Sequence, residues 1–186
     1  YKVRPILERL YDKFSTMYTP DKNIALDEGM LAWRGRLKFR VYNPGKITKY
    51  GILVRMVCES KSGYICTLKI YDADGISLRD TIFELLGPYL GHGYTLYMDN
   101  FYNSVALAKE LLENNTIVCG TIRQNRGVPR DFREQIKGLK RGEMTFIRDD
   151  QVLLLTWMDK KPITMISTMH SAEMVEVPRN FGKTTM

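Results

Sequence analysis

The chain has 186 residues, of which 44% are hydrophobic and 26% charged. This composition indicates one packed globular domain and excludes disordered or collagen-like chains. Its 28 lysines and arginines outnumber the 21 acidic residues, and the net charge of +7 favours an anionic partner such as nucleic acid.

The first half of the chain predicts a helix followed by three strands. Ile6, Leu10 and Phe14 recur on one helical face, which predicts an amphipathic helix that ends before Thr19. Apolar runs with turn residues between them then predict strands over residues 23–31, 50–60 and 63–72. The turn-like sequence at residues 60–63 makes the last two strands a hairpin.

Two helix and strand pairs follow. Ser77 and Asp80 form a capping box at the start of a helix that Gly87 and Pro88 end, and a strand is predicted over residues 94–99. A helix over residues 104–115 and a strand over 116–123 come next. The order β-β-β-α-β-α-β predicts an α/β fold with a mixed five-stranded sheet and flanking helices, which is the ribonuclease H-like layout.

The pattern of the sequence changes at Gln124, where a segment rich in basic residues begins. A basic segment over residues 124–142 is predicted as a loop, and residues 144–169 read as two or three strands that turn at Asp149–Asp150 and at Asp159–Pro162. We therefore divide the chain into an N-terminal helix (1–19), a ribonuclease H-like core (20–123), and a basic loop with a β-rich insertion subdomain (124–186).

Asp27 and Asp99 are the candidate metal ligands. Each lies at an apolar strand, where a buried carboxylate without a partner is costly. The predicted topology makes their strands neighbours, with the two side chains within about 4–6 Å, and paired carboxylates suit magnesium. The alternatives are that Asp27 is a salt-bridged strand residue and that Asp99 begins a turn or caps the next helix.

The other reactive residue types give no site. Glu28 alternates with Asp27 and is expected at the surface of the opposite sheet face. His92 and His170 have no partner at ligand or triad spacing, so we expect surface or turn histidines. The three cysteines lack the spacing of a disulfide scaffold or a zinc site, and are expected to be buried reduced thiols. The longest apolar run, Val152 to Leu155, is too short to span a membrane, so we expect a soluble protein, intracellular or trimmed.

Basic residues cluster between Leu31 and Tyr50, where no acidic residue occurs. The cluster comprises Arg34, Arg36, Lys38, Arg40, Lys46 and Lys49. Alternation of the first four predicts cations on one face of an extended segment, a spacing that suits phosphates, although a charged edge strand would look similar. A second group follows residue 122, namely Arg123, Arg126, Arg130 and Arg133. Both groups favour contact with double-stranded DNA.

Several blocks in order resemble the catalytic domain of piggyBac-type transposases and of piggyBac transposable element-derived proteins. They are Asp27-Glu28, Trp33-Arg34-Gly35-Arg36, Pro44 to Gly51, and Asp99 to Tyr102. The resemblance implies a ribonuclease H-like fold in which three aspartates and a divalent metal, magnesium or manganese, cut and join DNA. Asp27 and Asp99 match the first two aspartates. A nuclear location is implied, and a homodimer is compatible with it.

The family's third aspartate, in a Gly-Gly-Val-Asp type motif, and its cysteine-rich zinc domain have no match here. Asp149, Asp150, Asp159, Glu173 and Glu176 lack the context of that motif. We expect a piece of a longer chain or a truncated product that alone does not cleave DNA. A domesticated, inactive DNA- or chromatin-binding module is the alternative, and a protein with neither activity is a third.

Overall fold

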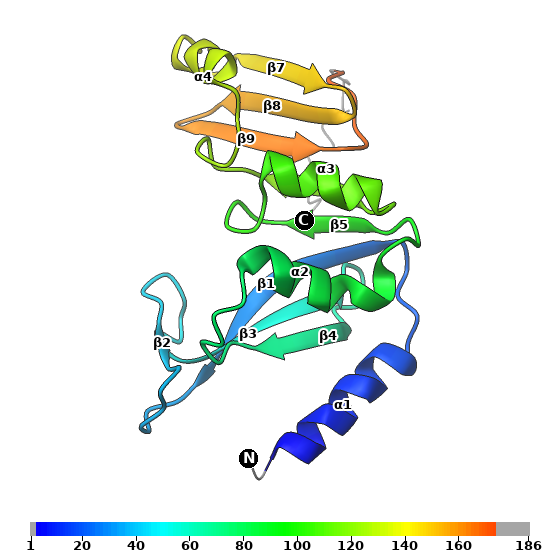
Figure 1. Cartoon of the computed structure of the whole chain (residues 1–186). Coiled ribbons are helices and arrows are strands. Elements are labelled where there is room, and N and C mark those ends of the chain that lie inside the picture. The colour runs from blue at the N-terminus through cyan, green and yellow to red at the C-terminus, as the bar shows by residue number, and fades with distance from the viewer. Residues whose placement is uncertain (1–2, 174–186) are drawn as a thin grey trace, which may run out of the picture.

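The structure is a computed structural model and describes residues 3–173. Figure 1 shows one broad sheet with helices packed along it. The helices are α1 (Arg4–Thr16), α2 (Leu78–Leu86), α3 (Val105–Glu113) and α4 (Arg130–Lys137), with a 3-10 turn at Gly87–Tyr89. The strands are β1 (Asn23–Ala32), β2 (Val41–Tyr42), β3 (Tyr50–Glu59), β4 (Ile65–Ile70), β5 (Thr95–Met98), β6 (Ile117–Thr121), β7 (Met144–Asp149), β8 (Val152–Met158) and β9 (Pro162–Ser167).

Five strands form the mixed sheet that the sequence predicts. They lie in the order β4-β3-β1-β5-β6, in which β4, β3 and β1 pair antiparallel and β1, β5 and β6 pair parallel. The parallel pairs need crossover connections, which α2 and α3 supply. The ribonuclease H-like layout is thereby confirmed.

The C-terminal strands continue this sheet. β9 pairs antiparallel with β6 through Gly120 and Ile166, and β8 and β7 follow as a meander. The complete order is β2-β3-β1-β5-β6-β9-β8-β7, with β4 on β3. The turns at Asp149–Asp150 and Asp159–Pro162 lie where the sequence places them. The boundary between core and insertion subdomain stays a prediction, because the two parts share one sheet.

The prediction of a loop throughout residues 124–142 is wrong, because α4 lies within it. Phe132 and Ile136, four residues apart, are 0% and 2% exposed and anchor the helix. Asp131 in the first turn and Lys137 in the last also suit the helix dipole. Two apolar residues among many charges are a weak signal in the sequence but are enough to bury one face.

The core lies between the sheet and two helices. Figure 1 draws α2 and α3 on the same side of the sheet, where α2 packs on β3 and β4, and α3 on β6 and β8. Ile82 of α2, Leu111 of α3, and Ile24 and Leu96 of the central strands are all 0% exposed. The buried face of β1 is therefore the one that carries Ile24 and Leu26, which decides where the following residues of that strand point.

Glu59 ends β3 and ties the β3–β4 turn to the start of β1. It is 4% exposed, and its oxygens accept hydrogen bonds from the Asp21 and Ser62 backbone N–H groups, each at 3.0 Å, and from the Ser62 hydroxyl. The Ser62 hydroxyl and these backbone donors hold the pKa of Glu59 at about 2. A carboxylate that accepts this many hydrogen bonds stabilises the fold in its ionised form.

Glu59→Gln is therefore expected to lower the free energy of unfolding at neutral pH. Because the folded pKa is below the unfolded value of about 4.3, the contribution of Glu59 is present above that value and is lost as pH falls toward 2. Urea denaturation at a series of pH values measures this. The two proteins should converge in stability between about pH 5 and pH 2, and a constant difference across that range would contradict the assignment.

Candidate functional site

Asp27 lies in the middle of β1, and Asp99 directly follows the end of the parallel strand β5. Leu26 and Met98 are the last register pair of β1 and β5, and each aspartate is the next residue. Neighbouring strands lie about 4.8 Å apart. This register therefore places Asp27 and Asp99 side by side at the point where β5 ends. Both aspartates are exposed, and the expectation of buried carboxylates is wrong. Asp99 follows the end of β5 at Met98, and Asp27 alternates with Leu26 and so lies on the face of β1 opposite the helix-covered one.

Backbone hydrogen bonds orient both aspartates. Oδ1 of Asp99 accepts from the Phe101 N–H at 2.9 Å, which makes an Asx turn directly after β5. Oδ1 of Asp27 accepts from the Glu28 N–H at 2.8 Å. Asp99 thus begins a turn, and the helix cap is Ser104, whose hydroxyl accepts from the Leu107 N–H.

Lys46 brings a positive charge to these carboxylates. Its Nζ lies 3.1 Å from Oε1 of Glu28 and 4.0 Å from Oδ1 of Asp27. Burial lowers the pKa of Lys46, but the Glu28 hydrogen bond and the charges of Asp27, Glu28 and Asp99 outweigh it and raise the pKa overall. The ammonium therefore lies in the combined field of all three acidic residues.

The prediction that Glu28 is a surface residue is wrong. Its side chain is only 16% exposed, because Glu28 shares the helix-covered face of β1 with Leu26. Oε2 accepts a 2.6 Å hydrogen bond from the hydroxyl of Tyr102, and Arg55 is its cross-strand partner on β3. Burial raises the pKa of Glu28, but the Tyr102 and Lys46 contacts lower it by more. Glu28 therefore stays ionised and anchors Lys46.

Asn103 fixes the loop that carries Asp99, a role the sequence did not reveal. Asn103 is 0% exposed, and its Nδ2 donates to the carbonyl oxygens of Met98 and Thr121, both at 2.9 Å. These two bonds join the ends of β5 and β6. A Cβ on Gly120 would lie 1.9 Å from the Met98 oxygen, so only glycine permits this close approach. The only signal in the sequence is a polar residue between a strand end and a helix cap.

A cavity of about 330 Å³ opens beside Asp99. Glu28, Asp99, Tyr102 and Arg123 contribute to its lining. Nε of Arg123 donates to Oδ1 of Asn100 at 3.0 Å. Nη2 of Arg126 donates to the Phe101 oxygen at 3.2 Å. The structure therefore brings two residues of the second basic group, Arg123 and Arg126, to the loop of Asp99. The other two, Arg130 and Arg133, lie on α4.

The remaining basic residues belong to a segment that we call the arm, residues 31–50. Arg34, Arg36, Lys38 and Arg40 do not alternate along a strand, because residues 33–40 form a loop with a turn at Lys38. They instead contribute to the lining of an open hollow of about 470 Å³. Nη1 of Arg40 donates to the carbonyl oxygens of Arg34 and Gly35, at 3.3 and 3.4 Å, and so braces the loop. The arm concentrates positive charge without the predicted extended geometry.

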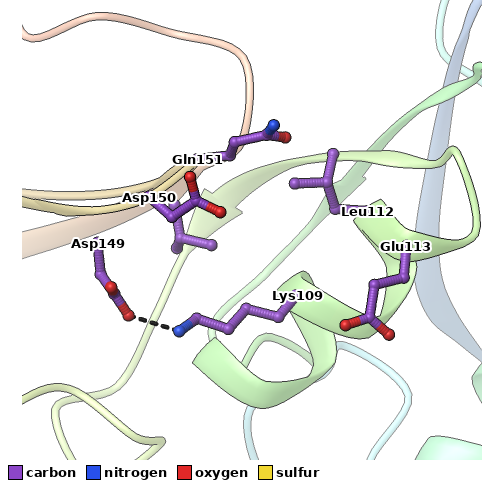
Figure 2. Close-up of a pocket in the computed structure, with 7 residues that line it drawn as sticks. Lys109, Leu112, Glu113, Asp149, Asp150 and Gln151 are labelled. Atoms are coloured by element: carbon purple, nitrogen blue, oxygen red, sulfur yellow. Dashed lines mark hydrogen bonds and ion pairs between the residues drawn. The ribbon is translucent and has the colours of Figure 1, made fainter.

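Figure 2 shows a separate cavity of about 360 Å³ between α3 and the β7–β8 turn. Lys109 forms an ion pair with Asp149 across it, beside Asp150 and Glu113. Five inter-strand steps separate β7 from β1 in the sheet, which amounts to about 24 Å. Asp149 and Asp150 are therefore too distant to complete the site of Asp27 and Asp99.

The histidines and cysteines do not form a reactive site among the described residues. Nδ1 of His170 lies 2.9 Å from Oγ of Ser167 and 3.9 Å from Sγ of Cys119. Burial raises the pKa of the Cys119 thiol, which is the opposite of what a nucleophile needs. His92 is exposed in the turn before β5. Within residues 3–173 the three cysteines are free thiols.

The donor types at the aspartate pair suit a hard divalent cation. Magnesium is bound through one or two carboxylates, with waters and substrate phosphates as further ligands. Asp27 and Asp99 supply such carboxylates, and Lys46 shows that the cluster already stabilises a cation. Residues 3–173 contain no group of three or more His, Cys, Asp or Glu side chains placed to hold a metal.

A family model described as Transposase IS4 matches residues 1–185. The chain belongs to the IS4 transposase family. Within it, the chain is of piggyBac type. Human PiggyBac transposable element-derived protein 3 is 24% identical over 90% of the chain, as is the human chimeric ERCC6-PGBD3 protein. A solved piggyBac transposase in a synaptic complex with hairpin DNA is 29% identical, with a TM-score of 0.84 over 94% of the chain.

This transposase-family chain spans 30% and 17% of the two human relatives and 39% of the solved transposase chain. The structural match extends over both the core strands and the C-terminal strands, which agrees with one continuous sheet. None of the helices in residues 3–173 combines the length and apolar character that a membrane span requires.

Proposed function

We propose that this chain is the DNA-binding and catalytic part of a piggyBac-type transposase, in which Asp27 and Asp99 hold a divalent metal, most simply magnesium, for DNA cleavage and strand transfer. The observation that carries the proposal is the register of β1 and β5, which places Asp27 in mid-strand next to Asp99 at the end of β5, with Lys46 close to Asp27 and Arg123 close to Asp99. The solved relative was determined with hairpin DNA, which supports DNA as the partner.

The proposal assigns a separate role to each of five residues of this chain. Asp27 and Asp99 would be the metal ligands, and Asn103 holds the turn that presents Asp99. Arg123 and Arg126 lie in the loop after β6, hydrogen-bond to that turn, and would contact DNA phosphates beside the site. A bound divalent ion would activate water or a 3′-hydroxyl and stabilise the charge on the reacting phosphate. A nuclear location follows from chromosomal DNA as the substrate, and the homodimer stays a prediction.

A catalytically inactive DNA-binding module is the second candidate. Lys46 favours it, because its ammonium neutralises the carboxylate cluster without any metal. One of the human relatives is named as a transposable element-derived protein, which also fits this candidate. Both candidates require DNA binding through the arm, so that property is tested first.

Arg36→Glu combined with Lys38→Glu is expected to weaken binding to duplex DNA. Both side chains are exposed, and each neutralised phosphate contributes about 0.9 to the slope of log affinity against log salt concentration. The double variant should lower that slope by about two and weaken all sequences alike, since phosphate contacts carry no base information. A salt titration of affinity, read by fluorescence anisotropy, measures the change.

Lys22→Glu combined with Lys61→Glu is the matched control. It makes the same change of charge at the far end of the β1–β3 hairpin, about 30 Å from the arm. The control should keep the slope of the unmodified protein. If the two double variants behave alike, the effect is one of net charge, and the arm is not the DNA-binding surface.

A further inference from the structure

The arm exposes aromatic and aliphatic side chains that the core does not use. Trp33, Tyr42 and Tyr50 are 46%, 55% and 53% exposed, and Ile47 is fully exposed. Figure 1 shows that β2 and its loops project from the sheet, away from the helices that cover the core. Large apolar side chains gathered at the surface indicate a binding partner rather than a packing role.

Three of these side chains, those of Trp33, Ile47 and Tyr50, line a hollow of the arm with a volume of about 730 Å³. Trp33 and Tyr50 line it, and the basic residues Arg34, Arg40 and Lys49 line it with them. The hollow is therefore aromatic with a rim of positive charge. That combination is the one that binds unpaired nucleotides, because bases stack on aromatic rings while cations follow the phosphates.

The aromatic walls are held in place before any ligand binds. The backbone N–H of Trp33 donates to the backbone oxygen of Tyr50 at 3.4 Å. The Trp33 indole lies so close to Gly35 that a Cβ at residue 35 would lie 2.9 Å from the indole Nε1. The Tyr50 ring lies 4.6 Å from that of Tyr42. The guanidinium of Arg40 lies 5.8 Å from the centre of the Tyr50 ring. The indole of Trp33 thus lies against Gly35 of the loop, while the side chain is 46% exposed and lines the hollow.

The positive charge of the arm indicates the chemical class of its partner. Residues 31–50 carry six basic and no acidic residues. A second copy of the chain that docked by the same face would bring like charges together, which is unfavourable. A polyanion with flat apolar groups satisfies both the charge and the rings, and nucleic acid is such a ligand.

We propose that the arm binds an unpaired base of DNA in this hollow, stacked on Trp33, with Arg34 and Lys49 on the flanking phosphates. The inference rests on DNA as the partner, but it adds a separate site that distinguishes an unpaired end from a blunt duplex. Stacking is tolerant of base identity, so the site should accept any base.

The two tryptophans of the chain, Trp33 and Trp157, allow a direct test. Trp157→Phe leaves Trp33 as the only indole, and Trp33→Phe leaves Trp157, which is similarly exposed at 48% on β8. Each variant is titrated with a blunt duplex and with the same duplex extended by four unpaired nucleotides. The extended duplex should quench Trp33 emission, and the blunt duplex should not. Trp157 emission should stay unchanged with both.

Affinity provides the second readout. Trp33→Ala should weaken binding of the extended duplex roughly tenfold and leave the blunt duplex unaffected. Circular dichroism melting checks that the exposed substitution leaves the fold intact. Equal quenching by both duplexes, or equal affinity of Trp33→Ala and the unmodified chain for the extended duplex, would overturn the site.

The remaining outcomes separate this site from the proposed function. If neither duplex binds, DNA binding itself fails, and the site fails with it. If both duplexes bind equally tightly and Trp33 emission does not respond, DNA binding stands and the stacking site is wrong. If Trp33 emission depends on protein concentration without DNA, a second copy covers the hollow, which also contradicts the proposal.

Discussion

Asp99→Asn is expected to lower metal-dependent DNA cleavage by the full-length protein that carries this chain at least about a hundredfold. Changes to groups that only orient metal ligands already cost about 10–100-fold, and loss of a ligand's charge should cost more. Asparagine keeps an Oδ1 that can accept from the Phe101 N–H, so the Asx turn survives. The measurement is the rate of strand cleavage with magnesium or manganese.

Asp74→Asn is the matched control for this change. Oδ1 of Asp74 accepts from the Ile76 N–H at 3.1 Å, so the residue makes the same kind of turn, but it lies between β4 and α2. It should keep normal cleavage. Full activity of Asp99→Asn, or equal losses in the two variants, would show that Asp99 is a structural turn residue. Absence of cleavage by the unmodified protein would support the catalytically inactive DNA-binding module.

Lys46→Met is expected to tighten manganese binding by this chain about tenfold. A charge pair at 4 Å is worth about 1 kcal/mol in water and about 4 kcal/mol near a protein surface. The Lys46 ammonium lies 4.0 Å from Asp27 and in the field of Asp99, so it opposes a second cation there. Electron paramagnetic resonance of free manganese measures the affinity without requiring any cleavage activity.

The same variant should be less stable in a metal chelator, because Glu28 and Asp27 lose their counter-charge. Added manganese should restore more stability to Lys46→Met than to the unmodified chain. Lys49→Met removes an exposed charge from the same arm and should change neither property. If Lys46→Met bound manganese no more tightly than Lys49→Met, the ammonium would not compete with metal at these carboxylates.

Hydrophobic periodicity was sufficient to predict most of the sheet. β1, β3, β5 and β6 are apolar runs bounded by turns, and the two helices between them force parallel pairing. The adjacency of Asp27 and Asp99 in the sheet follows from that order alone. Their role as metal ligands stays a prediction, because adjacency does not require a metal.

The features that the sequence did not reveal depend on contacts between distant segments. Glu28 is mostly buried on the helix-covered face of β1, where the hydroxyl of Tyr102, 74 residues away, donates a hydrogen bond to it. The alternation of residues along the strand does not predict that contact. Lys46 reaches the carboxylates from the arm, although the sequence places it only among DNA-binding cations. The alternation of Arg34, Arg36, Lys38 and Arg40 predicts an extended segment, but residues 33–40 form a loop that Arg40 braces.

The pairing of β9 with β6 has a consequence for any shortened version of the protein. β6 is the last of the core strands, and β9 covers its outer edge through Cys119, Gly120 and Thr121. A protein that ended at residue 123 would present that edge with unpaired N–H and C=O groups, which is a template for intermolecular strand addition. Such a shortened protein should associate into insoluble aggregates, and an internal deletion that removes only the β7–β8 hairpin would move the open edge from β6 to β9.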